Sequence, residues 1–235
     1  MDDKFYYLSY IIFFSLSVIF SVLINGLFLK FSRTLGIRQK ENQNQNIIRW
    51  ASTSKPSIGG FSLYIVFLLA VSIYSILNFS GSHFFNKELV GILLAFSFGF
   101  LVGLADDAYN TNPLLKFIGQ AVCGVILVFS GIMIHLTGSF MIDSLFTVLW
   151  VVGIMNSINM LDNMDGVTAS ISVSILVACL ISLAIGGQFF SINTFIVIGI
   201  VGALIGFLFY NIHPSKMYMG DTGSQFLGVA LSSLS

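Results

Sequence analysis

The chain has 235 residues, of which 56% are hydrophobic and only 9% are charged. About a quarter of the residues are charged in an ordinary soluble domain, so this composition excludes that class and indicates an integral membrane protein. Basic and acidic residues balance, ten against ten, and no basic patch is present, which argues against a nucleic-acid partner. Cys123 and Cys179 lie apart within apolar runs, and we interpret both as packing residues.

Apolar runs separated by polar segments predict membrane-spanning helices, each needing about 20 residues. The N-terminus lacks the basic start and small-residue cleavage site of a signal peptide, so the first run is expected to be retained. A final, shorter run over 224–235 is expected to begin an eighth helix. We predict an all-α, polytopic transmembrane helix bundle that forms one domain over residues 1–235. The seven expected spans are 5–29, 58–79, 89–105, 114–136, 142–155, 167–185 and 189–212.

Lysine and arginine residues fall unevenly on the two sides of these spans. Positive loops stay in the cytoplasm, so the richer side is predicted to be the inner one and the N-terminus to lie outside. The poorer side has only Lys4 and Lys87. The inner side collects Lys30, Arg33, Arg38, Lys40, Arg49, Lys55, Lys116 and Lys216.

Residues 156–167, NSINMLDNMDGV, place Asn156, Asn159, Asp162 and Asp165 at a spacing of three between two apolar runs. Neighbours in such a series share a helix face, whereas the first and last point apart, and a 3₁₀ turn or a break would align all four. Amide and carboxylate oxygens at a water boundary can hold Mg²⁺ and a polyphosphate. An ordinary wet loop uses the same turn residues, so this motif alone leaves both interpretations open.

Two more inner segments carry candidate residues. Lys55 precedes the sequence PSIGG, which allows close backbone approach beside a positive charge, although a helix-start turn with a positive-inside lysine fits equally well. Adjacent carboxylates repel each other, so Asp106 and Asp107 at a helix mouth are costly unless a cation or base lies near. One of the pair is therefore a candidate base, and a solvated loop is the alternative.

The last inner segment, 211–224, contains Asp221 between Gly220 and Thr222, at the start of the final helix. Free backbone N–H groups and the helix dipole favour an anion such as phosphate there, while helix capping is the simpler role for Asp221. We interpret His213 as a loop histidine rather than a ligand.

The alternation of spans places all of these residues on one side. Only four of the ten acidic residues fall on the other side: Asp2, Asp3, Glu88 and Asp143. Independent loops give no reason for this segregation. We therefore predict one polar site at the inner membrane face.

Taken together, the motifs resemble the polyprenyl-phosphate N-acetylhexosamine-1-phosphate transferases, glycosyltransferase family 4, which include the phospho-N-acetylmuramoyl-pentapeptide transferase. Asp106-Asp107 with Lys116 and Gln120 resembles the family's DD…K…Q element. Residues 156–167 resemble NxxNxxDGxDGL, 219–224 resemble MGDxGS and 56–60 resemble PTxxGG. Asn163 replaces the first Gly of DGxDG, a variant associated with the N-acetylglucosamine branch. Lys55 stands one residue later than the lysine of the pentapeptide branch.

The resemblance implies transfer of an amino-sugar 1-phosphate, GlcNAc-1-phosphate for this branch, from a UDP-sugar to undecaprenyl phosphate, with release of UMP. It implies a role in cell-envelope polysaccharide biosynthesis, such as that of lipopolysaccharide O-antigen, at the bacterial cytoplasmic membrane, with the active site facing the cytoplasm and a homodimer left open. The implied cofactor is Mg²⁺, with Mn²⁺ as an alternative, bound by Asp221 and Asn156. The implied catalytic residues are Asp106, Asp107 and Lys116. The residues implied to bind the donor are Lys55, Asn159, Asp162, Asp165, Asn211 and Tyr218.

Two alternatives remain. A transporter would use membrane carboxylates to relay protons or bind a coupling ion, but it would place them near mid-span on repeated, broken helices. Family members also have further helices and a histidine-rich cytoplasmic loop, which we expect to be absent here, so an inactive fragment of the transferase is the second alternative. The sequence contains no GxxxxGK[ST] loop, so phosphate binding is expected to depend on the metal, glycine-flanked backbone and Lys116.

Overall fold

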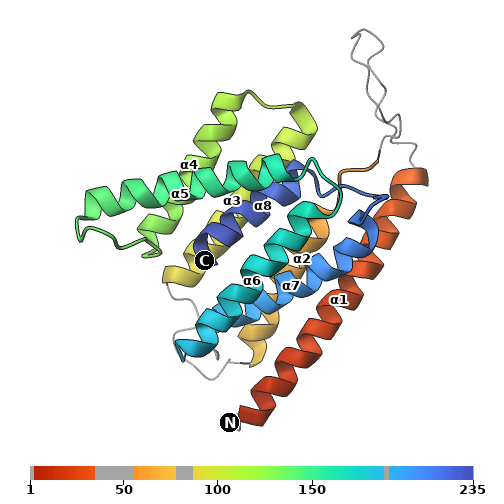
Figure 1. Ribbon diagram of the computed structural model, residues 1–235, viewed down its shortest axis with the longest axis horizontal. Helices are drawn as coiled ribbons and strands as arrows, with labels where there is room; N and C mark the ends of the chain where they lie inside the picture. Colours follow the sequence, from red (N-terminus) through yellow and green to blue (C-terminus); the bar gives the residue numbers. More distant parts are fainter. Residues whose placement is uncertain (1–2, 35–54, 78–86, 188–190, 235) are drawn as a thin grey trace.

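The computed structural model describes residues 3–34, 55–77, 87–187 and 191–234. This part of the chain forms eight α-helices and no strand, apart from an isolated parallel bridge between Ser57 and Tyr218. The all-α prediction is therefore confirmed. In chain order the helices are α1 Asp3–Thr34, α2 Gly60–Leu77, α3 Lys87–Tyr109, α4 Pro113–Phe129, α5 Phe140–Leu161, α6 Val167–Ile185, α7 Ile192–Asn211 and α8 Gly220–Leu234 (Figure 1).

Five of these helices, α1, α3, α5, α6 and α7, are long and apolar enough to cross a membrane. The helices α2 and α4 are apolar but shorter, and α8 has 15 residues. Such a set confirms a polytopic helical membrane protein. Because Gly131 adopts a φ of 90°, α4 ends at Phe129 and not at the predicted residue 136.

The turn between α4 and α5 is closed by Asp143, which is 1% exposed. Its carboxylate accepts hydrogen bonds from the backbone N–H groups of Leu136, Thr137 and Gly138 and from the Thr137 hydroxyl. The donors satisfy both oxygens of a carboxylate that is shielded from solvent. Asp143 therefore has a local structural role, in agreement with its predicted position away from the polar site.

Consecutive helices run up and down the bundle, and the turns α3–α4, α5–α6 and α7–α8 meet at the end opposite the N-terminus (Figure 1). The short helix α8 lies at the centre, in contact with α2, α3 and α5, and its side chains from Thr222 to Ser232 are buried. Its first turn, which carries Asp221, is thus surrounded by the other turns at this end.

Glycines permit α8 to come close to its neighbours. A Cβ atom at Gly103 of α3 would overlap the backbone carbonyl of Asp221, and one at Gly60 of α2 would overlap the backbone of Gly223. Main chain therefore packs on main chain around the first turn of α8. This contact fixes the position of Asp221.

The Gly103→Ala variant is expected to lower the free energy of unfolding by about 1–3 kcal/mol, because the added methyl group overlaps backbone that cannot rotate away. Thermal unfolding in detergent micelles measures the effect. Gly153→Ala is the matched control, since a Cβ atom there meets nothing within 4 Å. Equal losses of stability in the two variants would contradict the proposed packing of α3 on α8.

Candidate active site

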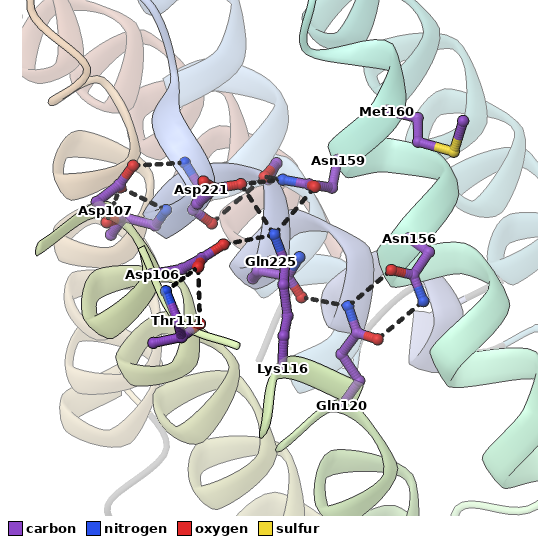
Figure 2. Close-up of polar contacts among 12 residues, drawn as sticks. Asp106, Asp107, Thr111, Lys116, Gln120, Asn156, Asn159, Met160, Asp221 and Gln225 are labelled. Atoms are coloured by element: carbon purple, nitrogen blue, oxygen red, sulfur yellow. Dashed lines mark hydrogen bonds and ion pairs between the residues drawn. The ribbon is translucent and has the colours of Figure 1, made fainter. Parts of the chain in front are cut away.

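Side chains from four helices meet around the ammonium group of Lys116, at the end of the bundle where the turns gather (Figure 2). The Nζ atom donates to Asp106 Oδ2 at 2.6 Å, to Asn159 Oδ1 at 3.1 Å and to Asp221 Oδ1 at 3.2 Å. These partners use all three ammonium donors. We call Asp106, Lys116, Asn159 and Asp221 the Lys116 cluster. It brings together residues from three of the predicted motifs.

Asp106 is held from both sides. Its Oδ1 atom accepts from the backbone N–H of Thr111 at 2.9 Å and from the Thr111 hydroxyl at 2.7 Å, while Oδ2 faces Lys116. This geometry makes Asp106 the counterion of Lys116. Thr111 was not predicted from the sequence, although its position in the short α3–α4 turn, just before the α4 cap at Asn112, was a usable signal.

Asp107 points instead to the start of α8. Its carboxylate accepts from the backbone N–H groups of Asp221 at 3.0 Å and Thr222 at 2.8 Å, and from the Thr222 hydroxyl. A carboxylate at a helix N-terminus satisfies free donors and interacts favourably with the helix dipole. The structure thus gives Asp107 a capping role across two helices, and its catalytic role stays a prediction.

Asn156 lies away from the Lys116 cluster, next to Gln120 of α4 (Figure 2). The two amides exchange hydrogen bonds of 2.8 and 3.1 Å, and Gln120 also donates to Gln225 Oε1 at 3.0 Å. Asn159, three residues further along α5, is the amide that contacts Asp221 and also donates to Ser224 at 2.8 Å. The amide nearest the candidate metal ligand Asp221 is therefore Asn159, and metal binding by Asn156 stays a prediction.

The 156–167 motif is divided by the end of α5 at Leu161. A tight turn follows, and Gly166, with a φ of 75°, starts α6. Asp162 stays close to the Lys116 cluster, where burial raises its pKa to about 7 and the negative charges of Asp221 and Asp107 add to this effect, against a hydrogen bond from the Gly220 backbone. The break does not align the four polar residues, because it turns Asp165 toward a second group of side chains.

The second group comprises Lys55, Asp165, Ser215 and Tyr218, which we call the Lys55 cluster. Asp165 accepts from the Ser215 hydroxyl at 2.7 Å and from the Ser215 backbone N–H at 3.1 Å. Lys55 Nζ lies 2.7 Å from Ser215 Oγ, 3.7 Å from Asp165 Oδ2 and 5.0 Å from the centre of the Tyr218 ring. Three of the residues predicted to bind the donor are thus neighbours. His213, which lies in the loop after α7 as interpreted from the sequence, also contacts Asp165, at 3.1 Å.

Backbone pairing builds the Lys55 cluster. The backbone N–H of Tyr218 donates to the Pro56 carbonyl at 3.0 Å, and Gly59 and Gly60 donate to the carbonyls of Tyr218 and Met219 at 3.1 and 2.9 Å. Asn211, which was predicted to bind the donor, is 2% exposed and lies beneath these segments. It accepts from the Gly166 N–H and donates to the Met217 carbonyl, both at 3.0 Å, and so joins the two turns.

The suitability of this end of the bundle for Mg²⁺ follows from its donors. No group of three or more His, Cys, Asp or Glu side chains that could hold a metal is present in the described ranges. Asp221, whose side chain is 33% exposed, and Asp162, whose charge interacts with that of Asp221, could still supply oxygen ligands. Mg²⁺ commonly uses one or two carboxylates and takes its other ligands from water and substrate phosphates. The residues therefore fit a metal that binds together with a phosphorylated substrate.

Asp165 supports a prediction of pH dependence. Hydrogen bonds from Ser215 lower its pKa to about 2 in the folded protein, from an ordinary 3.8. Because the folded pKa is depressed, Asp165 stabilises the fold above about pH 4, and this contribution is lost as the pH falls toward about 2. The unfolding temperature of the wild type should fall more steeply over this range than that of Asp165→Asn. Parallel curves would contradict the assigned contacts.

The chain matches the model of glycosyl transferase family 4 over residues 89–235, which contain the whole Lys116 cluster. It is 32% identical over 192 residues to the probable undecaprenyl-phosphate N-acetylglucosaminyl 1-phosphate transferase of Bacillus subtilis, covering 77% of this chain and 50% of that protein. It is 29% identical over 201 residues to the decaprenyl-phosphate N-acetylglucosaminephosphotransferase of Mycobacterium leprae, with coverages of 78% and 50%. The phospho-N-acetylmuramoyl-pentapeptide-transferase of Streptococcus thermophilus is 29% identical over 227 residues, with coverages of 88% and 65%. The chain thus spans about half to two thirds of the length of these curated relatives.

Proposed function

Because the chain belongs to glycosyl transferase family 4, we propose that it transfers a sugar 1-phosphate from a nucleotide sugar to a polyprenyl phosphate. The names of the relatives support this general reaction. The observation that carries the proposal is the Lys116 cluster, in which a half-buried lysine and two carboxylates meet at one end of a helix bundle. A transporter would need such carboxylates near mid-span.

In the proposed reaction, an oxygen of the lipid phosphate attacks the β-phosphorus of a UDP-sugar. A P–O bond forms between the two phosphates, the bond between the β-phosphorus and the bridging oxygen breaks, and UMP leaves with that oxygen. Such phosphoryl transfer depends on positioning and on neutralising negative charge. We assign the neutralising role to Lys116, which Asp106 holds in place.

We further propose that Asp221, with Asp162 beside it, binds Mg²⁺ when the donor is present. When bound, the ion would neutralise charge on the diphosphate. Asn156 supports α5 through its contacts with Gln120 in this scheme. Asp107 contributes by fixing the first turn of α8 and thereby the direction of Asp221.

The Lys55 cluster is proposed to bind the nucleotide end of the donor. It presents an ammonium group above the Tyr218 ring, a combination suited to a negatively charged ligand with a flat base. Asn163 in place of the first Gly of the DGxDG motif favours UDP-GlcNAc as the donor, and the name of the Bacillus subtilis relative favours undecaprenyl phosphate as the acceptor. The excess of basic residues on the same side favours a bacterial cytoplasmic membrane with the site facing the cytoplasm.

The test uses the purified chain in detergent with Mg²⁺, UDP-GlcNAc and undecaprenyl phosphate. Release of UMP, measured by chromatography, together with formation of a lipid-linked sugar diphosphate is the expected result. UDP-MurNAc-pentapeptide in place of UDP-GlcNAc tests the donor. A folded protein that releases no UMP with either donor would contradict the proposal.

A further inference from the structure

The ion pair between Lys55 and Asp165 is interrupted by a serine. Lys55 Nζ lies 3.7 Å from Asp165 Oδ2, which is longer than a hydrogen bond, whereas Ser215 Oγ lies 2.7 Å from Lys55 Nζ and 2.7 Å from Asp165 Oδ1. An ammonium only donates and an ionised carboxylate only accepts. The Ser215 proton therefore points to Asp165, and an oxygen lone pair accepts from Lys55.

Ser215 is well placed to act as a spacer because its own position does not depend on Lys55. It is 5% exposed, and its backbone N–H donates to Asp165 Oδ2 at 3.1 Å. The next backbone N–H, that of Lys216, donates to the Tyr210 carbonyl at 2.7 Å. Lys55, by contrast, carries its charge on a flexible four-carbon stem.

We propose that Ser215 is a positioning residue that holds the Lys55 ammonium away from Asp165 and above the Tyr218 ring, where it remains available to the nucleotide donor. This inference rests on the proposed function. The 5.0 Å from Nζ to the ring centre is within the range of a cation–π contact. Without the hydroxyl, the ammonium is expected to move into direct contact with Asp165 and to leave the Tyr218 ring.

The kinetic test measures KM and kcat separately. Ser215→Ala should raise the KM for the UDP-sugar about tenfold, with kcat and the KM for undecaprenyl phosphate nearly unchanged, because it removes a contact that orders a charged group. Ser215→Thr, which keeps the hydroxyl, should restore the KM. Ser170→Ala is the matched control, since among the described residues the Ser170 hydroxyl donates only to the carbonyl of Gly166, just before its own helix.

A double variant separates positioning from general damage. In a Lys55→Met background, Ser215→Ala should have no further effect on the donor KM, because the group that it positions is gone. Effects that multiply, or an equal rise in the KM for the lipid acceptor, would overturn the inference.

A second measurement does not depend on turnover. Direct contact with Asp165 ties the Lys55 amine into a charge-assisted hydrogen bond, so Ser215→Ala should slow the labelling of Lys55 by a water-soluble amine reagent about threefold. Mass spectrometry measures the labelling rate of Lys55 relative to that of Lys216, which is exposed. An unchanged labelling ratio would overturn the spacer role, whereas a wild type that releases no UMP would count against the proposed function alone.

Discussion

The Lys116→Met variant is expected to release UMP roughly a thousandfold more slowly than the wild type. Lys116 is the cation that contacts both Asp106 and Asp221, at 2.6 and 3.2 Å, so its loss leaves uncompensated negative charge where the donor diphosphate must bind. Methionine keeps the length and the apolar stem of the side chain but has no charge. Initial rates of UMP release at saturating donor and acceptor measure the effect.

Loss of stability is the main confounding effect, because Lys116→Met also removes the partner of Asp106, whose side chain is 9% exposed. The unfolding temperature should therefore fall. Adding Asp106→Asn removes the unpaired charge and should restore the unfolding temperature without restoring activity. If the double variant recovered turnover along with stability, Lys116 would be a structural residue and the proposed charge neutralisation would be wrong.

The order of the helices and the sidedness of the polar turns were predictable because both depend on local patterns. Apolar runs mark the spans, and the alternation of these spans predicts on which side of the membrane each charged or amide residue lies. Asp221 follows Lys116 by 105 residues in the sequence, yet counting the intervening spans was enough to place both at one end. The early end of α4 was not predictable from hydrophobicity, because residues beyond Gly131 are still apolar and only the backbone reverses.

The division into two clusters depends on geometry that spacing alone does not contain. The end of α5 at Leu161 and the left-handed Gly166 direct Asp165 to Ser215, whereas Asn159 stays on the helix and reaches Asp221. Likewise, Asp106 and Asp107 are adjacent in the sequence, but the helix directs their side chains differently. Asp106 contacts Lys116, and Asp107 contacts the start of α8. Two neighbouring carboxylates therefore have different roles, which no reading of the pair as a unit could show.

Replacement of Asp221 by asparagine is expected to reduce UMP release by roughly a thousandfold or more while leaving the fold intact. Asparagine has nearly the same shape and keeps an oxygen toward Lys116, but it lacks the negative charge that a divalent ion requires. The fold should tolerate the change, because the main-chain contacts of Gly60 and Gly103 and the cap from Asp107 hold this turn. Activity and thermal unfolding are to be measured on the same preparation.

A second measurement follows Mg²⁺ binding through the unfolding temperature. With UDP present, added Mg²⁺ should raise the unfolding temperature of the wild type, because a ligand that binds only the folded state stabilises it. Asp221→Asn should lose this rise, whereas Glu88→Gln, which removes one negative charge at the other end of the bundle, should keep it. If Asp221 were only a helix cap, asparagine, which caps about as well as aspartate, would leave the stability, kcat and the Mg²⁺ response unchanged. That outcome would remove Asp221 as the metal ligand and would move the search to Asp162, the buried carboxylate whose charge interacts with those of Asp221 and Asp107.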